Sequence, residues 1–115
     1  MSEGLFGIHA AALELRSQRM GLITSNIANA ATPGYKAKDI DFSAALKAKI
    51  GGADTDSAAS AATLYRVPLM PSLDGNTVEL PTEQVAFSEN AVGYSATLNF
   101  IRGRVDTITR ALKGD

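Results

Sequence analysis

The chain has 115 residues and a mass of 12.0 kDa, the size of one small domain and too small for a multidomain enzyme. Its 11 basic and 12 acidic side chains leave a net charge of -1, so no excess of positive charge favours nucleic acid or anionic lipid. With no cysteine and a single histidine, His9, the sequence excludes disulfides, thiolate chemistry and a zinc site built from several Cys or His ligands.

The first expected element is a helix from about residue 5 to residue 31, which the helix breaker Thr32-Pro33-Gly34 ends. Its apolar residues follow two adjacent tracks: Leu5, Ile8, Ala12, Leu15 and Leu22 on one, and Phe6, Leu13, Met20, Ile23 and Ile27 on the other. Because this stripe is wider than one partner helix covers, we expect the helix to contact neighbours on more than one side.

A short helix is expected early in the middle of the chain. Asp41 can act as its N-cap, Phe42, Leu46 and Ile50 share one face, and Gly51-Gly52 ends it. Residues 51–63 follow, with the sequence GGADTDSAASAAT, which is small, polar and without periodicity. This composition predicts a mobile linker that holds no rigid site.

Residues 64–80 contain two prolines and the turn Leu73-Asp74-Gly75-Asn76. Proline removes a backbone donor from a strand, so this segment is expected to form only short extended pieces or a hairpin around Asp74-Gly75.

A long helix is expected from about residue 82 to residue 112, with Pro81 at its first position and a length of roughly 46 Å. Its apolar residues alternate in steps of four and three, which is a heptad pattern. We call this set the heptad stripe: Phe87, Ala91, Tyr94, Leu98, Ile101, Val105, Ile108 and Leu112. We expect it to pack on the N-terminal helix, mainly through the first apolar track of that helix: Leu5, Ile8, Ala12, Leu15 and Leu22.

These elements predict a mainly α fold: an antiparallel coiled coil of long N- and C-terminal helices with a small irregular, β-containing middle segment. Within one structural domain, we divide the chain into residues 1–35 for the N-terminal helix and turn, 36–80 for the irregular middle, and 81–115 for the C-terminal helix.

The sequence offers no convincing catalytic, cofactor-binding or metal-binding residue. His9 is expected to be an interface or surface histidine, and Asp39 and Asp41 fit a turn ligand and a helix cap better than a general acid and base. No glycine-rich phosphate-binding motif is present. The basic residues near the C-terminus alternate around the heptad stripe, which favours a solvated or inter-subunit helix face.

Two glycines, Gly93 and Gly103, interrupt the C-terminal helix, where each costs about 1 kcal/mol relative to alanine. Two explanations remain open. Another backbone approaches closely there, or the helix is marginal alone and is ordered by assembly.

The most distinctive segment is SNIANAATPGYK, residues 25–36. Asn26 and Asn29 share a helix face at positions where a coiled coil normally carries leucine. Their amides fit either of two roles, which the pattern leaves equally open. They set the register between subunits, or they solvate a frayed helix end.

This segment closely resembles the N-terminal motif of the axial proteins of the bacterial flagellum, the rod and hook family. The segments KDIDF at 38–42 and DGNTVE at 74–79 look like those of its proximal rod members. The resemblance covers about residues 1–50 and 74–113. Leu80-Pro81 departs from the family pattern, which carries an acidic residue near the start of the last helix.

The resemblance implies a structural subunit, not an enzyme, whose terminal helices are commonly disordered before assembly. In similar proteins these helices polymerise into the axial drive shaft and export channel of the basal body. The implied partners are other rod proteins, copies of the same chain, the FliE adaptor, the MS ring and the flagellar export gate. Neither nucleic acid nor a direct transmembrane segment is implied, and a small helical partner-binding or regulatory module remains the alternative.

The resemblance also accounts for the absence of targeting signals. No stretch reaches 18 apolar residues, and MSEGLFGIHA lacks the regions of a cleavable signal peptide. Such a sequence fits the cytosol, or the periplasmic rod if the flagellar type III system exports the chain. The expected subunit interface consists of Leu5, Ile8, Leu15, Leu22, Asn26, Asn29, Pro33, Gly34, Tyr35, Tyr94, Leu98, Ile101, Val105 and Ile108.

Overall fold

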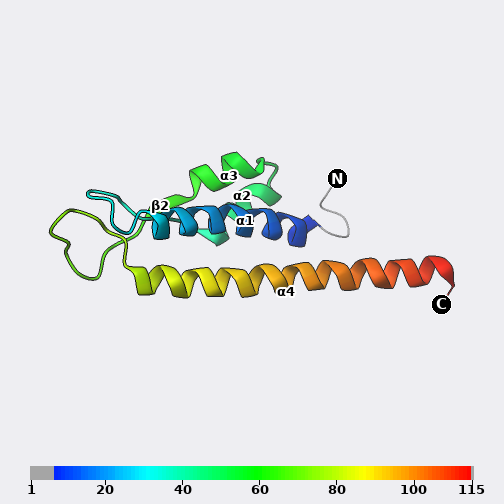
Figure 1. The fold of residues 1–115 in the computed structure, drawn as a ribbon. Helices are drawn as coiled ribbons and strands as arrows, with labels where there is room; N and C mark the ends of the chain where they lie inside the picture. The colour runs from blue at the N-terminus through cyan, green and yellow to red at the C-terminus, as the bar shows by residue number, and fades with distance from the viewer. Residues whose placement is uncertain (1–6, 115) are drawn as a thin grey trace.

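The computed structural model describes residues 7–114 of the chain, which form an elongated molecule of 65 × 26 × 18 Å. Two long helices lie side by side, and the smaller elements cover the other side of the first one (Figure 1). The elements in chain order are α1 (Gly7–Ala28), β1 (Lys38–Ile40), α2 (Phe42–Ile50), α3 (Thr55–Ala61), β2 (Thr63–Tyr65) and α4 (Leu80–Lys113). The predicted mainly α fold with long terminal helices and a small middle sheet is confirmed.

The two long helices are antiparallel and differ in length, 22 residues for α1 and 34 for α4. At 1.5 Å per residue these lengths are roughly 33 and 51 Å. The stacking of His9 on Phe100 marks where the described start of α1 lies along α4. The last turns of α4 therefore extend beyond Gly7 (Figure 1).

The ends of the helices follow their capping residues. The side chain of Asp41 accepts a hydrogen bond from the Ala44 N–H and starts α2, as predicted. Pro81 lies in the first turn of α4, and Gly114, with φ of 80°, ends that helix. Glu79 occupies the N-cap position of α4 but makes no side-chain cap bond. Helix α1 ends at Ala28, earlier than predicted.

The prediction of a mobile linker over residues 51–63 is wrong. This segment contains α3, whose N-cap Asp54 accepts a hydrogen bond of 2.8 Å from the Ser57 N–H. The buried alanines Ala58, Ala59 and Ala62 pack into the core. The prediction failed because we took the small residues of this segment, many of them alanine, as typical of a linker. Alanine is in fact the strongest helix former, and its small side chain allows helices to approach closely.

The sheet has two antiparallel strands, β1 and β2, with Lys38 opposite Tyr65 and Ile40 opposite Thr63. The expected short extended piece therefore exists, but it pairs with β1 and not across a local hairpin. The residues Asp74-Gly75 form a turn within a longer loop, where Gly75 has a φ of 78°.

The apolar core lies between α1, α2, α3 and β1, on the side of α1 away from α4. Its members are Leu15, Ile40, Ala45, Ala58, Ala59 and Ala62, with Leu22 packed against them. The heptad stripe was expected to pack on Leu15 and Leu22, and this expectation is wrong. The face of α1 that meets α4 instead carries His9, which stacks on Phe100, and Arg16, whose side chain lies beside Gly93.

Candidate assembly surface and its polar junction

The contact between α1 and α4 is more polar than the heptad pattern suggested. On α4 the buried residues are Glu83, Ala86 and Asn90, which lie on one helix face. This face runs beside the heptad stripe, so the stripe lies at the edge of the contact. Phe87 is consequently 41% exposed and Val105 is 48% exposed.

Asn26 lies at one end of this contact, in the last turn of α1, and is fully buried. Its Nδ2 donates to the Lys38 carbonyl at 2.7 Å and to Glu83 Oε1 at 2.9 Å, and its Oδ1 accepts from the Lys38 N–H at 3.1 Å. The amide thus pairs with both backbone groups of Lys38, as a peptide group of a further strand would. The frayed-end interpretation is wrong for Asn26, which joins α1 to β1 and α4.

A network of charged side chains surrounds Asn26. We call it the polar junction: Arg19, Asn26, Asp39, Arg66 and Glu83. Arg66 Nε lies 2.6 Å from the fully buried Glu83, and Arg66 Nη2 lies 3.0 Å from Asp39. Arg19 donates to both Asp39 oxygens, at 2.8 and 2.9 Å. The junction therefore ties α1, β1, the segment after β2 and the first turn of α4 together.

The environment of Asp39 favours its ionised form. Burial alone raises the pKa of a carboxyl group, but hydrogen bonds from Arg19 and from the Ile40 N–H, with the charge of Arg66, outweigh burial at Asp39. The pKa of Asp39 is therefore lowered below its usual value. The pKa of Arg19 is raised, chiefly by its hydrogen bonds to Asp39.

The turn after α1 is held by a second asparagine that the sequence analysis missed. The Nδ2 of Asn76 donates to the carbonyl oxygens of Asn29, Ala30 and Thr32, at 2.7 to 3.1 Å. These carbonyls lie just beyond the last turn of α1, where helix carbonyls lack partners. The only signal in the sequence was an asparagine after Asp74-Gly75, which indicated a turn but not its distant partner.

The remaining residues of the turn lie nearer the surface. Asn29 donates to the Ser25 carbonyl and accepts from the Thr32 hydroxyl, Pro33 is exposed, and Tyr35 is half-buried with its hydroxyl 3.1 Å from Ser25 Oγ. Gly34 adopts a φ of 76°, which is a left-handed conformation that favours glycine. Asn29 therefore closes the end of α1, and a role between subunits stays a prediction.

The two glycines of α4 have different surroundings. A Cβ added at Gly93 would lie 2.5 Å from Arg16 Nη1, whereas a Cβ at Gly103 would meet nothing within 4 Å. The Arg16 guanidinium lies 4.4 Å from the centre of the Phe42 ring, so Gly93 leaves room for a side chain that bridges α2 and α4. The close approach is thus made by an arginine side chain, not by a backbone.

The residues weighed for catalysis do not converge. His9 stacks on Phe100 at 4.0 Å, Asp39 belongs to the polar junction, and Asp41 caps α2. Over residues 7–114, no three His, Cys, Asp or Glu side chains are grouped to hold a metal ion. Over the same residues, no helix is long and apolar enough to span a membrane.

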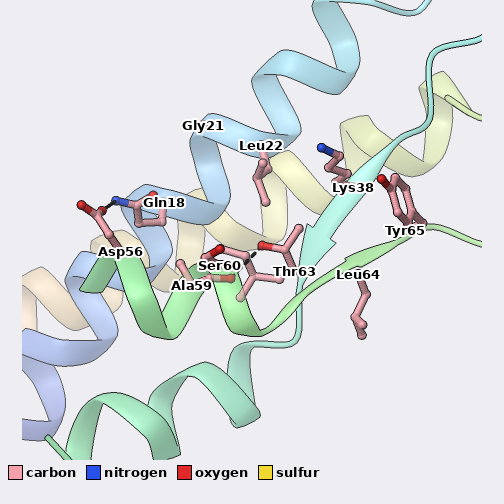
Figure 2. Close-up of a pocket in the computed structure, with 11 residues that line it drawn as sticks. Gln18, Gly21, Leu22, Lys38, Asp56, Ala59, Ser60, Thr63, Leu64 and Tyr65 are labelled. Atoms are coloured by element: carbon pink, nitrogen blue, oxygen red, sulfur yellow. Dashed lines mark hydrogen bonds between the residues drawn. The ribbon is translucent and has the colours of Figure 1, made fainter. Parts of the chain in front are cut away.

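A groove of about 570 Å³ lies between α1, α3 and the sheet (Figure 2). Gln18 donates to Asp56 at 3.2 Å at one end, and the Lys38 ammonium lies 5.7 Å from the Tyr65 ring at the other. Gly21 and Leu22 contribute the wall from α1. These groups give contact surface, with no pair placed for proton transfer.

The expected interface residues divide into three groups. Leu15 and Asn26 are fully buried within the chain, so they serve an interface only by holding α1 in place. Leu5 lies outside the described residues. The others retain accessible surface: Ile8, Leu22, Asn29, Pro33, Gly34, Tyr35, Tyr94, Leu98, Ile101, Val105 and Ile108.

Comparison with known proteins places the chain among flagellar proteins. The family described as "Flagella basal body rod protein" matches residues 6–36, which include α1 and the turn after it. The "Flagellar basal body rod protein FlgB" of Cereibacter sphaeroides is 47% identical over 120 residues, covering 95% of this chain and 94% of the relative. The proteins of the same name from Aeromonas hydrophila and Escherichia coli are 42% and 36% identical, over 96% and 89% of this chain and 93% and 88% of their own lengths.

Proposed function

The chain belongs to the FlgB family of flagellar basal body rod proteins, and we propose that it builds the rod by polymerising through its terminal helices. As a member of this family, it is a structural subunit of the basal body rod that assembles with other rod components, and it is not an enzyme. Family membership also decides against the alternative of a small regulatory module.

The observation that carries the proposal is the incomplete burial of the heptad stripe, in which Phe87, Val105 and Leu112 are exposed and the other members are half-buried. The stripe follows α4 to its last turn, but α1 covers the face beside it. Burying a large apolar side chain is worth roughly 1.5 to 3 kcal/mol, so a subunit gains by covering this stripe with a neighbour. Stacked subunits of this kind form the axial drive shaft, with the export channel inside it.

The proposed interface consists of α4 and the end of α1. Tyr94, Leu98, Ile101, Val105 and Ile108 contribute apolar surface. The turn Pro33-Gly34-Tyr35 contributes an exposed corner with an amphipathic ring. Ile8 and Leu22 of α1 and Asn29 just after it add accessible surface. Leu5, which lies outside the described residues, completes the proposed set.

The proposed partners follow from family membership. They are copies of the same chain, the other rod proteins, the FliE adaptor, the MS ring and the flagellar export gate. The chain reaches the periplasmic rod through the flagellar type III system, without a cleaved signal peptide. Because the chain has no cysteine, it cannot form non-native disulfides in an oxidising compartment.

Complementation tests the proposal. A strain that lacks its own copy of this protein is expected to make no rod, hook or filament, and the wild-type chain restores all three. Leu98→Asp and Ile101→Asp place a charge in the proposed interface and are expected to abolish rod assembly. The control Asn99→Asp changes an exposed neighbour and leaves assembly intact. Normal motility of both interface variants would contradict the proposal.

A further inference from the structure

The loop between β2 and α4 exposes an unusual amount of apolar surface. We call residues 67–73 the apolar loop, because their sequence VPLMPSL contains no charged residue. Val67, Leu69 and Met70 are 87%, 84% and 74% exposed, and Leu73 is fully exposed. Four large apolar side chains exposed within seven residues indicate an interaction site.

The backbone around the apolar loop is held by hydrogen bonds. The Glu79 carboxylate accepts from the N–H groups of Leu69 and Met70 at 3.0 to 3.3 Å, which explains why it does not cap α4. The Asp74 carbonyl accepts from the Gly34 N–H at 2.9 Å, and the Lys36 ammonium donates to the Gly75 carbonyl. The loop therefore presents its apolar side chains in a defined conformation and loses little entropy on binding.

A second exposed apolar surface lies at the opposite end of the molecule. The last turns of α4, residues 101–113, carry the end of the heptad stripe, where Val105 is half exposed and Leu112 is mostly exposed. Residues 101–114 also carry four basic side chains and one acidic side chain, a net charge of +3. Figure 1 shows this end of α4 and the apolar loop at the two ends of the long axis.

Building on the proposed rod function, we propose that the apolar loop of one copy binds the last turns of α4 in a second copy, head to tail. Charge complementarity supports a second copy as the partner. Residues 7–100 carry seven basic and nine acidic side chains, a net charge of -2, against +3 on residues 101–114. The exposed carboxylate of Asp74 flanks the loop, and Arg102, Arg104 and Arg110 flank the stripe.

The state of Asp74 agrees with this arrangement. Hydrogen bonds from the Ser72 hydroxyl and the Asn76 N–H lower the pKa of Asp74, so its carboxylate is ionised at neutral pH. The Lys36 ammonium lies beside this carboxylate, so the surroundings of the loop have no excess of positive charge that would attract an anionic membrane or nucleic acid. The loop matches an apolar helix face with basic flanks.

The geometry of the contact determines the form of the assembly. The two surfaces are different and lie at opposite ends, so each copy binds one neighbour at each end. Such head-to-tail contacts produce closed rings or open helical assemblies, whereas a two-fold contact stops at a dimer. This inference therefore names one inter-subunit contact of the proposed rod.

Disulfide trapping tests the contact, because the chain has no cysteine of its own. The double variant Leu69→Cys with Leu112→Cys replaces the native protein in cells, and intact basal bodies are analysed by non-reducing electrophoresis. A disulfide forms only when the two Cβ atoms lie about 3.5 to 4.5 Å apart. The expected result is a ladder of dimers and higher multiples that reducing agent collapses. The pair Met70→Cys with Ile108→Cys tests a second register.

Three control variants show whether the cross-link is specific to the proposed contact. Leu69→Cys alone and Leu112→Cys alone are expected to stay monomeric, as is the pair Lys47→Cys with Leu112→Cys, whose first position is exposed on α2. If a double variant assembles no rod, the two single variants are expressed together, and a cross-linked dimer of the two is expected.

Several outcomes would overturn the inference. They are a dimer from Leu69→Cys alone, a cross-link only to a different protein, or assembled rods without any cross-link in either register. Failure of the wild-type chain to restore rods would instead overturn the proposed function, so the two failures are distinguishable.

Discussion

The two ends of α4 belong to one continuous helix but have opposite relations to the rest of the chain. The N-terminal part, residues 80–97, buries Glu83, Ala86 and Asn90 against α1. The C-terminal part, residues 101–113, leaves Val105 and Leu112 exposed. Contacts within the chain fix the position of the first part. The second part has apolar surface that the described part of the chain does not cover. This difference indicates that folding and assembly use different sections of the same helix.

The chemistry of the two parts explains the division. The first part is fixed by directional bonds, since Glu83 accepts from Asn26 and Arg66, and Asn90 donates to the Arg16 carbonyl. Such bonds allow one register only. The second part carries apolar and basic side chains, whose attraction to a neighbour is less directional and suits contact between subunits.

The largest expected effect comes from removing a charge from the polar junction. Arg66→Met leaves the fully buried Glu83 without its ion-pair partner, so the free energy of unfolding is expected to fall by about 3 to 5 kcal/mol. Urea denaturation of the purified chain measures this loss. The matched variant Arg102→Met, on the exposed part of α4, is expected to change stability by less than about 0.5 kcal/mol. Equal effects of both variants would remove the distinction between the two parts.

A smaller loss is expected at Asn26. Asn26→Leu removes the partner of both Lys38 backbone groups and of Glu83, and it is expected to destabilise the isolated chain by about 1 to 3 kcal/mol. Asn29→Leu is expected to cost less, because Asn29 is only half-buried and bonds within its own turn. If Asn26→Leu kept full stability in denaturant titrations but lost rod assembly, Asn26 would act between subunits after all.

Substitutions at the two glycines of α4 are expected to change the free energy of unfolding by only about 1 kcal/mol. Gly103→Ala fills open space and is expected to stabilise α4 by about 1 kcal/mol through helix propensity. Gly93→Ala has the same propensity gain, but its Cβ displaces Arg16 from Phe42, so the gain is offset. Thermal unfolding followed by circular dichroism ranks the two variants. If Gly93→Ala stabilised the chain more than Gly103→Ala, the displacement of Arg16 from Phe42 would cost no free energy.

The smallest effect is a dependence on pH. Because the folded pKa of Asp39 lies below its unfolded value, its ionised form stabilises the fold. This contribution is complete above the unfolded pKa of about 3.9 and is lost as the pH falls through the lower folded pKa. The stability difference between wild type and Asp39→Asn is therefore expected to shrink below about pH 4. A constant difference from pH 7 to pH 2 would contradict this assignment.

Much of the fold could be predicted from periodicity and capping. The two long helices, the cap at Asp41 and the turn at Asp74-Gly75 all depend on residues close together in sequence. Helix α3 was missed because its evidence is tertiary: small alanines pack on Leu15, which lies far away in sequence. Local composition carries no information about such contacts.

The site could be predicted less completely, for the same reason. The motif that contains Asn26 stood out as unusual, but its partners Lys38 and Glu83 lie 12 and 57 residues away. In the sequence, Glu83 is one acidic residue near the start of a predicted helix, and Arg66 belongs to no motif. The heptad pattern identified the apolar residues of α4 correctly, and we expected them to pack on α1. Periodicity shows which residues share a helix face, but it does not show which partner covers that face.

Hydrogen exchange along α4 tests the division between folding and assembly most directly. In the isolated full-length chain, amides of residues 84–97 are expected to exchange slowly, and those of residues 104–113 are expected to exchange close to the rate of a frayed helix. In assembled basal bodies both parts are expected to be protected. Equal protection along the whole of α4 in the isolated chain, or no gain at residues 104–113 on assembly, would contradict the account.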